Sequence, residues 1–119
     1  MNRIVVEGNV ARDAEMIEYS EIGRVCVRWV TATERINPRT NRQVGTDYIP
    51  CQYWMDAGET FDASQLKKGA RVSLEGRLRI QWDPEAKKQY VHVSVGKLLC
   101  RDKGGERIAK IETPVYHAV

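Results

Sequence analysis

The sequence lacks the residues that several large classes of protein depend on. Its three cysteines, Cys26, Cys51 and Cys100, are odd in number and form no C-x-x-C pair, so neither a disulfide framework nor a zinc knuckle is indicated. We expect all three to be buried thiols. Two histidines without H-E-x-x-H spacing make a histidine-based metal site unexpected. Neither G-x-S-x-G nor G-x-x-x-x-G-K-[ST] occurs, and these are common signatures of hydrolases and phosphate-binding loops. The sequence therefore predicts a protein that is not an enzyme and needs no cofactor.

Long apolar runs are also missing. No run approaches the roughly 20 residues that a membrane-spanning helix needs, and the first residues lead into strand-like sequence rather than a signal peptide. We therefore expect a cytoplasmic protein without a membrane partner. A chain of 119 residues is long enough for one hydrophobic core without metal or disulfide. The domain is predicted to cover residues 1–111, followed by a short tail at 112–119.

What the sequence does contain is a series of short runs rich in β-branched residues, which predict an all-β domain. The runs cover residues 3–10 with an extension at 15–19, then 24–33, 47–55, 71–81 and 89–99, with a last short segment at 107–111. One helix is predicted at 56–66, where Asp56 and Glu59 resemble a capping box and Phe61 is the apolar anchor. Five strands with one short helix between strands 3 and 4 are typical of the five-stranded Greek-key barrel called the OB-fold. An immunoglobulin-like sandwich would need about seven strands.

Alternation within the runs predicts which side chains face the core. Tyr90, His92 and Ser94 should face outward. The residues expected to face inward are Val72, Leu74, Leu78, Ile80, Val91, Val93 and Val95. Gly76 falls on the inward side, and a glycine inside a strand often marks a bend or bulge. The polar segment 34–46, with several turn-forming residues and three arginines, predicts a long basic loop.

Two aromatic residues stand on a polar face of the third run. Tyr48 and Trp54 share that face with Pro50 and Gln52, about 20 Å apart along an extended strand. Each could stack on a separate base, which is worth about 1–3 kcal/mol per base and requires no particular sequence. The alternative for Trp54 is that it covers the helix or a subunit interface.

The other two tryptophans differ in their expected surroundings. Trp82 falls where the fourth strand enters a turn with Lys87 and Lys88, which favours an exposed stacking residue at a hairpin tip. Its parity also allows an inward-facing position at the barrel mouth. Trp29 alternates with apolar residues and is expected in the core.

Charge is distributed unevenly along the chain. Residues 1–24 hold three cations and five carboxylates, a net of −2, whereas residues 67–79 hold five cations and one carboxylate, a net of +4. A groove lined by such cations would attract a phosphate backbone. The basic candidates are Arg3, Arg35, Arg39, Arg42, Arg71, Arg77, Arg79, Lys87 and Lys88. The alternative for the strand residues is an ordinary solvated face.

Three motifs together resemble the bacterial single-stranded DNA-binding proteins. They are N-R-I-V-V-E-G-N-V-A-R-D at residues 2–13, W-V-T-A-T at 29–33 and K-K-G-A-R-V-S-L-E-G-R-L at 67–78, within a resemblance that covers roughly residues 2–99. The resemblance implies an OB-fold that forms a homo-oligomer, usually a tetramer, with dimers among the primosomal relatives. It also implies base stacking by Tyr48 and Trp54. Trp82 corresponds to a hairpin aromatic of the family but comes one residue early, and Ile36 is the nearest match to a further stacking tryptophan.

The sequence departs from this family after the barrel, because it ends at residues 113–119 without the usual acidic tip that recruits replication and repair enzymes. We therefore expect a domain that binds single-stranded DNA with little sequence preference, in replication, repair or recombination. A primosomal replication-restart accessory protein and an oligomeric OB-fold scaffold with little DNA binding are the alternatives. Stacking and phosphate contacts do not distinguish DNA from RNA.

Overall fold

The described part of the chain is built almost entirely of β-strands. A computed structural model describes residues 1–56, 58, 59, 61–102 and 104–111, so the predicted tail at 112–119 lies outside the described residues. The strands are β1 (Ile4–Val10), β2 (Glu15–Tyr19), β3 (Arg24–Asn37), β4 (Arg42–Asp56), β5 (Arg71–Asp83), β6 (Lys88–Arg101) and β7 (Arg107–Ile111), and the helical turns are η1 (Ser20–Ile22) and η2 (Ala63–Gln65). The all-β prediction is confirmed. None of the described helices is long and apolar enough to span a membrane.

Five of these strands close into a barrel. The order β1-β5-β6-β4-β3 is completed by pairing between β1 and β3, where Asn9 faces Ala32 and Val10 faces Thr31. Strands β4 and β6 run parallel, whereas the other neighbouring pairs are antiparallel. This is the predicted five-stranded Greek-key OB-fold barrel. Strand β2 extends the barrel beside β3, and β7 pairs with β6.

The barrel interior holds the residues that the alternation placed inward. Val72, Leu74, Val93 and Val95 are buried, and Trp29 is 3% exposed in the same core, as predicted. The cysteines are free and buried, which confirms the prediction of buried thiols. Burial raises the pKa of Cys26 and of Cys51 to about 11, so both thiols stay protonated at neutral pH.

Two glycines lie where strands approach each other too closely for a side chain. A Cβ on Gly76 would overlap the backbone oxygen of Ser94 and come within 2.9 Å of Val93 Cγ1, and a Cβ on Gly8 would overlap the backbone oxygen of Ala32. The register between β5 and β6 shifts at Glu75/Gly76. The predicted bulge at Gly76 is therefore confirmed, and its cause is close packing against β6.

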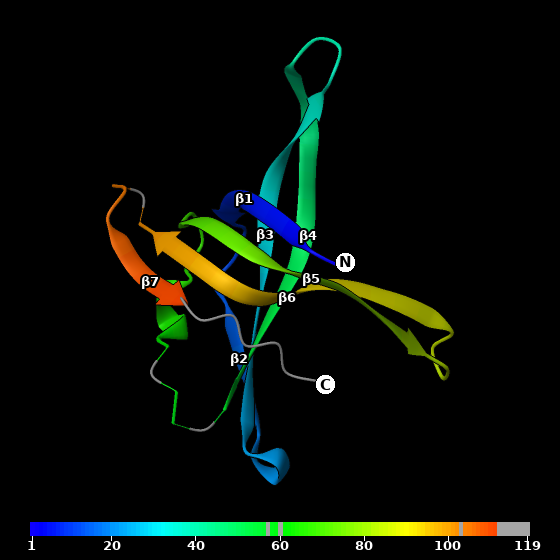
Figure 1. Ribbon diagram of the computed structural model, residues 1–119, viewed down its shortest axis with the longest axis vertical. Helices are drawn as coiled ribbons and strands as arrows, with labels where there is room; N and C mark the ends of the chain where they lie inside the picture. Colours follow the sequence, from blue (N-terminus) through cyan, green and yellow to red (C-terminus); the bar gives the residue numbers. More distant parts are fainter. Residues whose placement is uncertain (57, 60, 103, 112–119) are drawn as a thin grey trace.

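Three hairpins project from the barrel (Figure 1). They are the β3–β4 arm, the β5–β6 arm and the β2–β3 hairpin, which carries η1 at its end. The predicted loop at 34–46 is wrong in part, since β3 continues to Asn37 and β4 begins at Arg42. Backbone pairing between the two strands, with Arg35 opposite Gly45, needs no apolar side chains. A polar segment can therefore form a hairpin arm.

Three predicted core residues are exposed because they lie on the β5–β6 arm. Leu78, Ile80 and Val91 are 37%, 55% and 46% exposed, although their parity matches the buried residues of the same strands. The alternation continues after the strands leave the barrel, where no layer covers the apolar side. His92 is a further correction, since it keeps its outward parity but is only 7% exposed.

The predicted helix at 56–66 is wrong. In the described part of this segment the only helical turn is η2, whose first turn is capped by Asp62 through the Ser64 N–H. Glu59 Oε1 does accept from the Asp56 N–H (3.1 Å), but Gly58 follows with a φ of 98°, which no right-handed helix contains. Phe61 packs edge-on against Tyr53, with ring centroids 5.6 Å apart. The described part of this segment is therefore a loop with one helical turn, anchored to the barrel.

Candidate nucleic-acid interface

The outward face of β4 carries the predicted aromatic pair. Cys51, Tyr53 and Met55 are buried, while Tyr48 is 66% exposed on the opposite side of the strand, as the alternation predicted. Directly paired residues of antiparallel strands share a face. Tyr48, Pro50, Gln52 and Trp54 therefore share the outward face with their β3 partners Ala32, Val30, Arg28 and Cys26.

Trp54 is half-buried and held by two neighbours. Its ring lies 5.2 Å from that of Tyr19, at an angle of 34°, and its Nε1–H donates to Gln52 Oε1 (3.3 Å). Cover by the predicted helix is excluded, because the described part of residues 56–66 forms no α-helix and only the short turn η2. The indole is thus fixed in place while part of its surface remains accessible.

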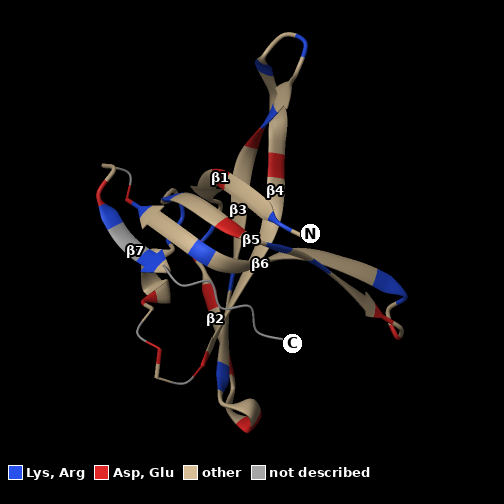
Figure 2. Cartoon of the chain, viewed as in Figure 1, with Lys and Arg blue, Asp and Glu red and all other residues tan. Residues whose placement is uncertain are grey.

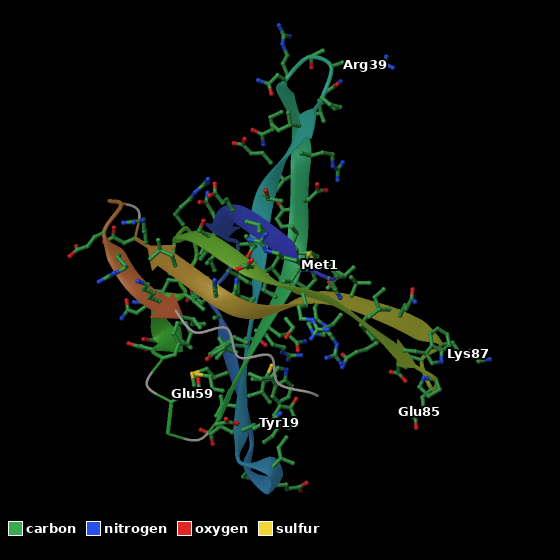
Figure 3. All side chains as sticks on the ribbon, viewed as in Figure 1. Met1, Tyr19, Arg39, Glu59, Glu85 and Lys87 are labelled. Atoms are coloured by element: carbon green, nitrogen blue, oxygen red, sulfur yellow. The ribbon has the colours of Figure 1, made fainter. Side chains whose placement is uncertain are left out.

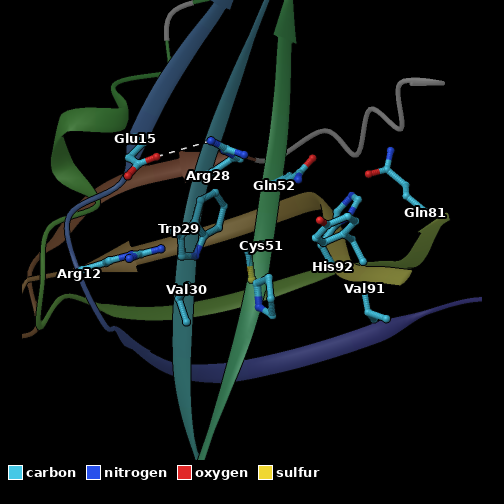
Figure 4. Close-up of a pocket in the computed structure, with 12 residues that line it drawn as sticks. Arg12, Glu15, Arg28, Trp29, Val30, Cys51, Gln52, Gln81, Val91 and His92 are labelled. Carbon is cyan, nitrogen blue, oxygen red and sulfur yellow. Dashed lines mark ion pairs between the residues drawn. The ribbon is translucent and has the colours of Figure 1, made fainter. Parts of the chain in front are cut away.

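A hollow of about 490 Å³ lies beside the middle of β4 (Figure 4). Pro50 and Gln52, which stand between Tyr48 and Trp54 on the strand, are part of its wall. One side is formed by the β5–β6 arm and the other by the turn after β1 together with β3. The lining residues are Arg12, Glu15, Arg28, Trp29, Val30, Pro50, Cys51, Gln52, Gln81, Tyr90, Val91 and His92.

Two arginines make this hollow cationic. Arg28 pairs with Glu15 (3.6 Å), as drawn in Figure 4, and both side chains are exposed. Arg12 forms no ion pair within the part of the chain that the structure describes. The pKa of His92 is lowered by burial and by the nearby charge of Arg79, so its imidazole is neutral at pH 7. The net effect is a basic hollow with one paired and one available guanidinium.

Arg12, Arg28 and Tyr90 are candidate site residues that the sequence reasoning missed. Tyr90 could have been found, because the alternation already placed it on the outward side of the last long strand. It is 50% exposed, as a stacking aromatic must be. The signal for Arg28 was its position next to the core residue Trp29. Arg12 could not be found in this way, because it lies in a turn that only the closed barrel brings near β4.

The predicted cations of the β3–β4 arm lie far from this hollow. Arg39 is at the tip of the arm (Figure 3), and Arg42 begins the returning strand. Arg35 lies on the same arm but donates from Nε to Asp47 Oδ1 (3.0 Å), and this hydrogen bond raises its pKa further. The arm therefore ends in cations (Figure 2), while Arg35 is neutralised by its partner.

The β5–β6 arm has two chemically different faces. Arg77, Arg79 and Gln81 pair with Ser94, His92 and Tyr90 on one face, while Leu78, Ile80 and Trp82 pair with Val93, Val91 and Gln89 on the other. Trp82 is 62% exposed and thus lies along the arm rather than at the barrel mouth. It faces away from the side that carries Tyr90. Lys87 and Lys88 lie at the turn of the same arm (Figure 3).

Two predicted cations lie on other parts of the barrel. Arg3 forms an ion pair with Glu75, which also contacts Lys97 (3.6 Å), and the Arg3 hydrogen bond lowers the pKa of Glu75. Arg71 begins β5 between Asn9 and Arg101. The structure therefore separates the predicted residues into the outward face of β4, two basic arms and the β1–β5 side of the barrel.

No group of three or more histidine, cysteine, aspartate or glutamate side chains within the described residues is arranged to hold a metal ion. The chemistry that the site can perform is instead stacking on Tyr48 and Trp54 and charge neutralisation in the hollow bordered by Pro50 and Gln52. Both suit a polyanion with exposed flat bases.

Comparison with known proteins gives concordant matches. The sequence profile of the single-strand binding protein family matches residues 1–98. A single-stranded DNA-binding protein of Staphylococcus epidermidis is 28% identical over 81 residues, covering 66% of this chain and 58% of that protein. The chain thus spans little more than half the length of this curated relative.

Two crystal structures of the single-stranded DNA binding protein from Thermus aquaticus have a similar fold. A deletion mutant superimposes with a TM-score of 0.69 at 17% identity, covering 91% of this chain and 54% of that chain. The wild-type protein superimposes with a TM-score of 0.59 at 23% identity, covering 100% of this chain and 43% of that chain. These similarities support the barrel assignment.

Proposed function

This chain belongs to the single-strand binding protein family, and on that basis we propose that it binds single-stranded DNA with little sequence preference and without catalysing a reaction. The observation that carries this proposal is the outward face of β4. There, Tyr48 and Trp54 share a face with Pro50 and Gln52, which border a hollow that Arg12 and Arg28 make basic.

The arrangement explains tolerance of sequence. Every base has a flat face, so each ring can stack on any base for about 1–3 kcal/mol. A phosphate between two stacked bases would lie in the hollow, where Arg12 has no competing ion pair among the described residues. Arg28 would have to share its charge between a phosphate and Glu15. Specificity for one base would require hydrogen-bond readout of base edges, which the stacking mode does not use.

The two arms extend this surface. Arg39 and Arg42 end one arm, and Lys87 and Lys88 end the other. Cations at these tips would attract the strand on both sides of the hollow. Trp82 lies on the apolar face of its arm, so a strand that reaches both Trp54 and Trp82 must cross from one face of this arm to the other.

We also propose that the protein acts as a homo-oligomer, a tetramer or a dimer, in DNA replication, repair or recombination. The family resemblance supports both statements. Light scattering after size-exclusion chromatography measures the mass of the assembly directly, and a monomer at micromolar concentration would contradict the oligomer.

The test is a titration with oligo-dT, followed by tryptophan fluorescence and by the anisotropy of the labelled oligonucleotide at low and high salt. We expect saturable quenching and an affinity that decreases with salt, with a slope of about −0.7 per neutralised phosphate. Trp54→Ala should weaken binding by about 1–3 kcal/mol without unfolding the domain, which circular dichroism checks. Met16→Ala is the control and should bind as wild type does. Met16 is 52% exposed but pairs with Val27, so it lies on the face of β2 opposite to that of Tyr19 and Trp54.

Absence of quenching and of binding would refute the proposal and favour a replication-restart accessory protein or an oligomeric scaffold. A parallel titration with oligo-U determines whether RNA is bound as well, since stacking and phosphate contacts serve both polymers.

A further inference from the structure

The ring contact between Tyr19 and Trp54 joins two strands that are not neighbours. Tyr19 ends β2 and pairs with Arg24, whereas Trp54 pairs with Cys26 on the other side of β3. Their ring centroids are 5.2 Å apart, with an angle of 34° between the planes. Tyr19 therefore reaches diagonally across β3 to cover one part of the indole.

Together with Gln52, this contact restricts the indole from two directions. Trp54 Nε1–H donates to Gln52 Oε1 (3.3 Å), which fixes the edge of the ring, and Tyr19 limits its rotation. Ordering a flexible side chain on binding costs affinity, whereas a ring already held in place avoids that cost. A fixed indole is thus a better stacking surface than a mobile one.

Tyr19 contributes little to the barrel itself. It is 41% exposed and is absent from the core cluster and from the residues packed against that cluster within the described chain. Its phenol hydroxyl has no hydrogen-bond partner among the described residues, so the contact with Trp54 depends on the ring alone. Loss of this ring should affect Trp54 more than it affects folding.

The charges around Tyr19 argue against a phosphate site of its own. Glu18 and Glu21 flank it in sequence on the β2–β3 hairpin, whose tip is acidic in Figure 2. Its cross-strand partner Arg24 already forms an ion pair with Asp56 (3.4 Å). Figure 3 shows Tyr19 on this hairpin, away from the two basic arms. A strand of DNA would therefore approach Trp54 from the side of the hollow.

We propose that Tyr19 is a positioning residue that holds Trp54 in the orientation in which it stacks on a base of single-stranded DNA. The inference rests on the proposed function, in which Trp54 is the stacking residue. In this role Tyr19 does not contact the base itself and acts only through Trp54.

A double-mutant cycle tests this role, with the affinity for labelled oligo-dT measured for wild type, Tyr19→Ala, Trp54→Ala and the double variant. Tyr19→Ala should weaken binding between about 2-fold and 12-fold, the equivalent of one ring–ring contact. In the Trp54→Ala background the same change should cost nothing further. Tyr19→Phe keeps the ring and should bind as wild type does.

The possible results separate the inference from its premise. If wild type binds and Trp54→Ala weakens binding, but Tyr19→Ala has no effect, the positioning role is wrong while the proposed function stands. Additive losses in the double variant would also overturn it, because they mean that Tyr19 stacks on a base of its own. If wild type does not bind, the proposed function fails first. Tyr19→Leu is a second truncation that keeps apolar bulk on the hairpin, and it should weaken binding as Tyr19→Ala does.

Discussion

Replacing Gly76 by alanine should destabilise the barrel strongly, and the structure shows why. The added Cβ would overlap the backbone oxygen of Ser94 and lie 2.9 Å from Val93 Cγ1, whereas carbon atoms in contact are usually about 3.5–4.0 Å apart. The obstacle is backbone, so no side-chain rotation can relieve it. Strand β5 or β6 would have to shift at the bulge that closes this side of the barrel.

The expected loss lies in the upper part of the range for overpacked cores, about 2–3 kcal/mol. With an unfolding entropy of roughly 2.1 cal/mol/K per residue, a chain of this length loses about 8–12 °C in Tm for that amount. Thermal unfolding followed by far-UV circular dichroism measures the shift, and urea unfolding measures the free energy.

Gly45→Ala is the matched control for this substitution. A Cβ on Gly45 would meet only the Arg35 guanidinium, at 3.5 Å from Nη1, and Gly45 also lies in a strand next to a register shift. We expect its stability to change by no more than about 0.5 kcal/mol. If the Gly76→Ala and Gly45→Ala proteins melt within about 2 °C of each other, the close approach at Ser94 does not constrain the barrel and the argument is wrong.

Three further outcomes can be checked on single variants. Arg12→Gln should reduce the salt dependence of oligo-dT binding by about 0.7 in the log–log slope, and an unchanged slope would remove Arg12 from the phosphate path. Because burial and Arg79 lower the pKa of His92, the folded protein binds this proton less readily than the unfolded chain. The His92 contribution to stability should therefore be complete above pH about 6.5 and decline as the pH falls below it. In His92→Gln the urea concentration at the unfolding midpoint should depend less on pH between pH 5 and 7 than in wild type. An equal pH dependence in the two proteins would exclude His92 as the cause. Asn2 Nδ2 donates to the Leu78 carbonyl and Asn2 Oδ1 accepts from the Leu78 N–H, both at 2.8 Å. Asn2→Ala should therefore accelerate hydrogen exchange of the Leu78 amide, measured by NMR. Equal exchange rates in the two proteins would show that this pair of hydrogen bonds does not hold the base of the arm.

The sequence predicted the barrel well because its alternation reflects a layer that really is buried on one side. In β4, Cys51 and Tyr53 point into the core and Trp54 points out of it, as the period-2 pattern requires. The same pattern failed at Leu78 and Ile80 for a physical reason. Alternation shows which residues share a face of a strand, but only the tertiary structure determines whether another layer covers that face.

The errors at 34–46 and 56–66 have a related cause. Polar composition suggested a loop at 34–46, yet paired strands need only backbone hydrogen bonds to form. At 56–66 the Asp56–Glu59 contact was real, but Gly58 has a φ of 98°, and the residues three and four positions after Phe61 are the polar Ser64 and Gln65. The capping contact between Asp56 and Glu59 is therefore compatible with a loop and does not by itself predict a helix.

The candidate site could be predicted only in part. Tyr48 and Trp54 were identifiable because both lie in one strand, so their shared face follows from spacing alone. Arg12 and Tyr90 join the same surface from a turn and from an arm, and their proximity depends on how the barrel closes. Contacts between residues that are distant in sequence depend on the order of the strands in the barrel, and one sequence alone does not show that order.

The pairing of β1 has a consequence for the order of events during synthesis. Val10 ends β1 and Arg71 begins its main partner β5, so residues 11–70 must be made before the two strands can meet. At about 5–20 residues per second, the ribosome needs roughly 3–12 s to add those 60 residues. During this interval the nascent β1 has a free edge and no lasting partner, because its contact with β3 involves only Asn9 and Val10. Strand β1 therefore emerges well before its main partner and stays without that pairing until β5 has been made.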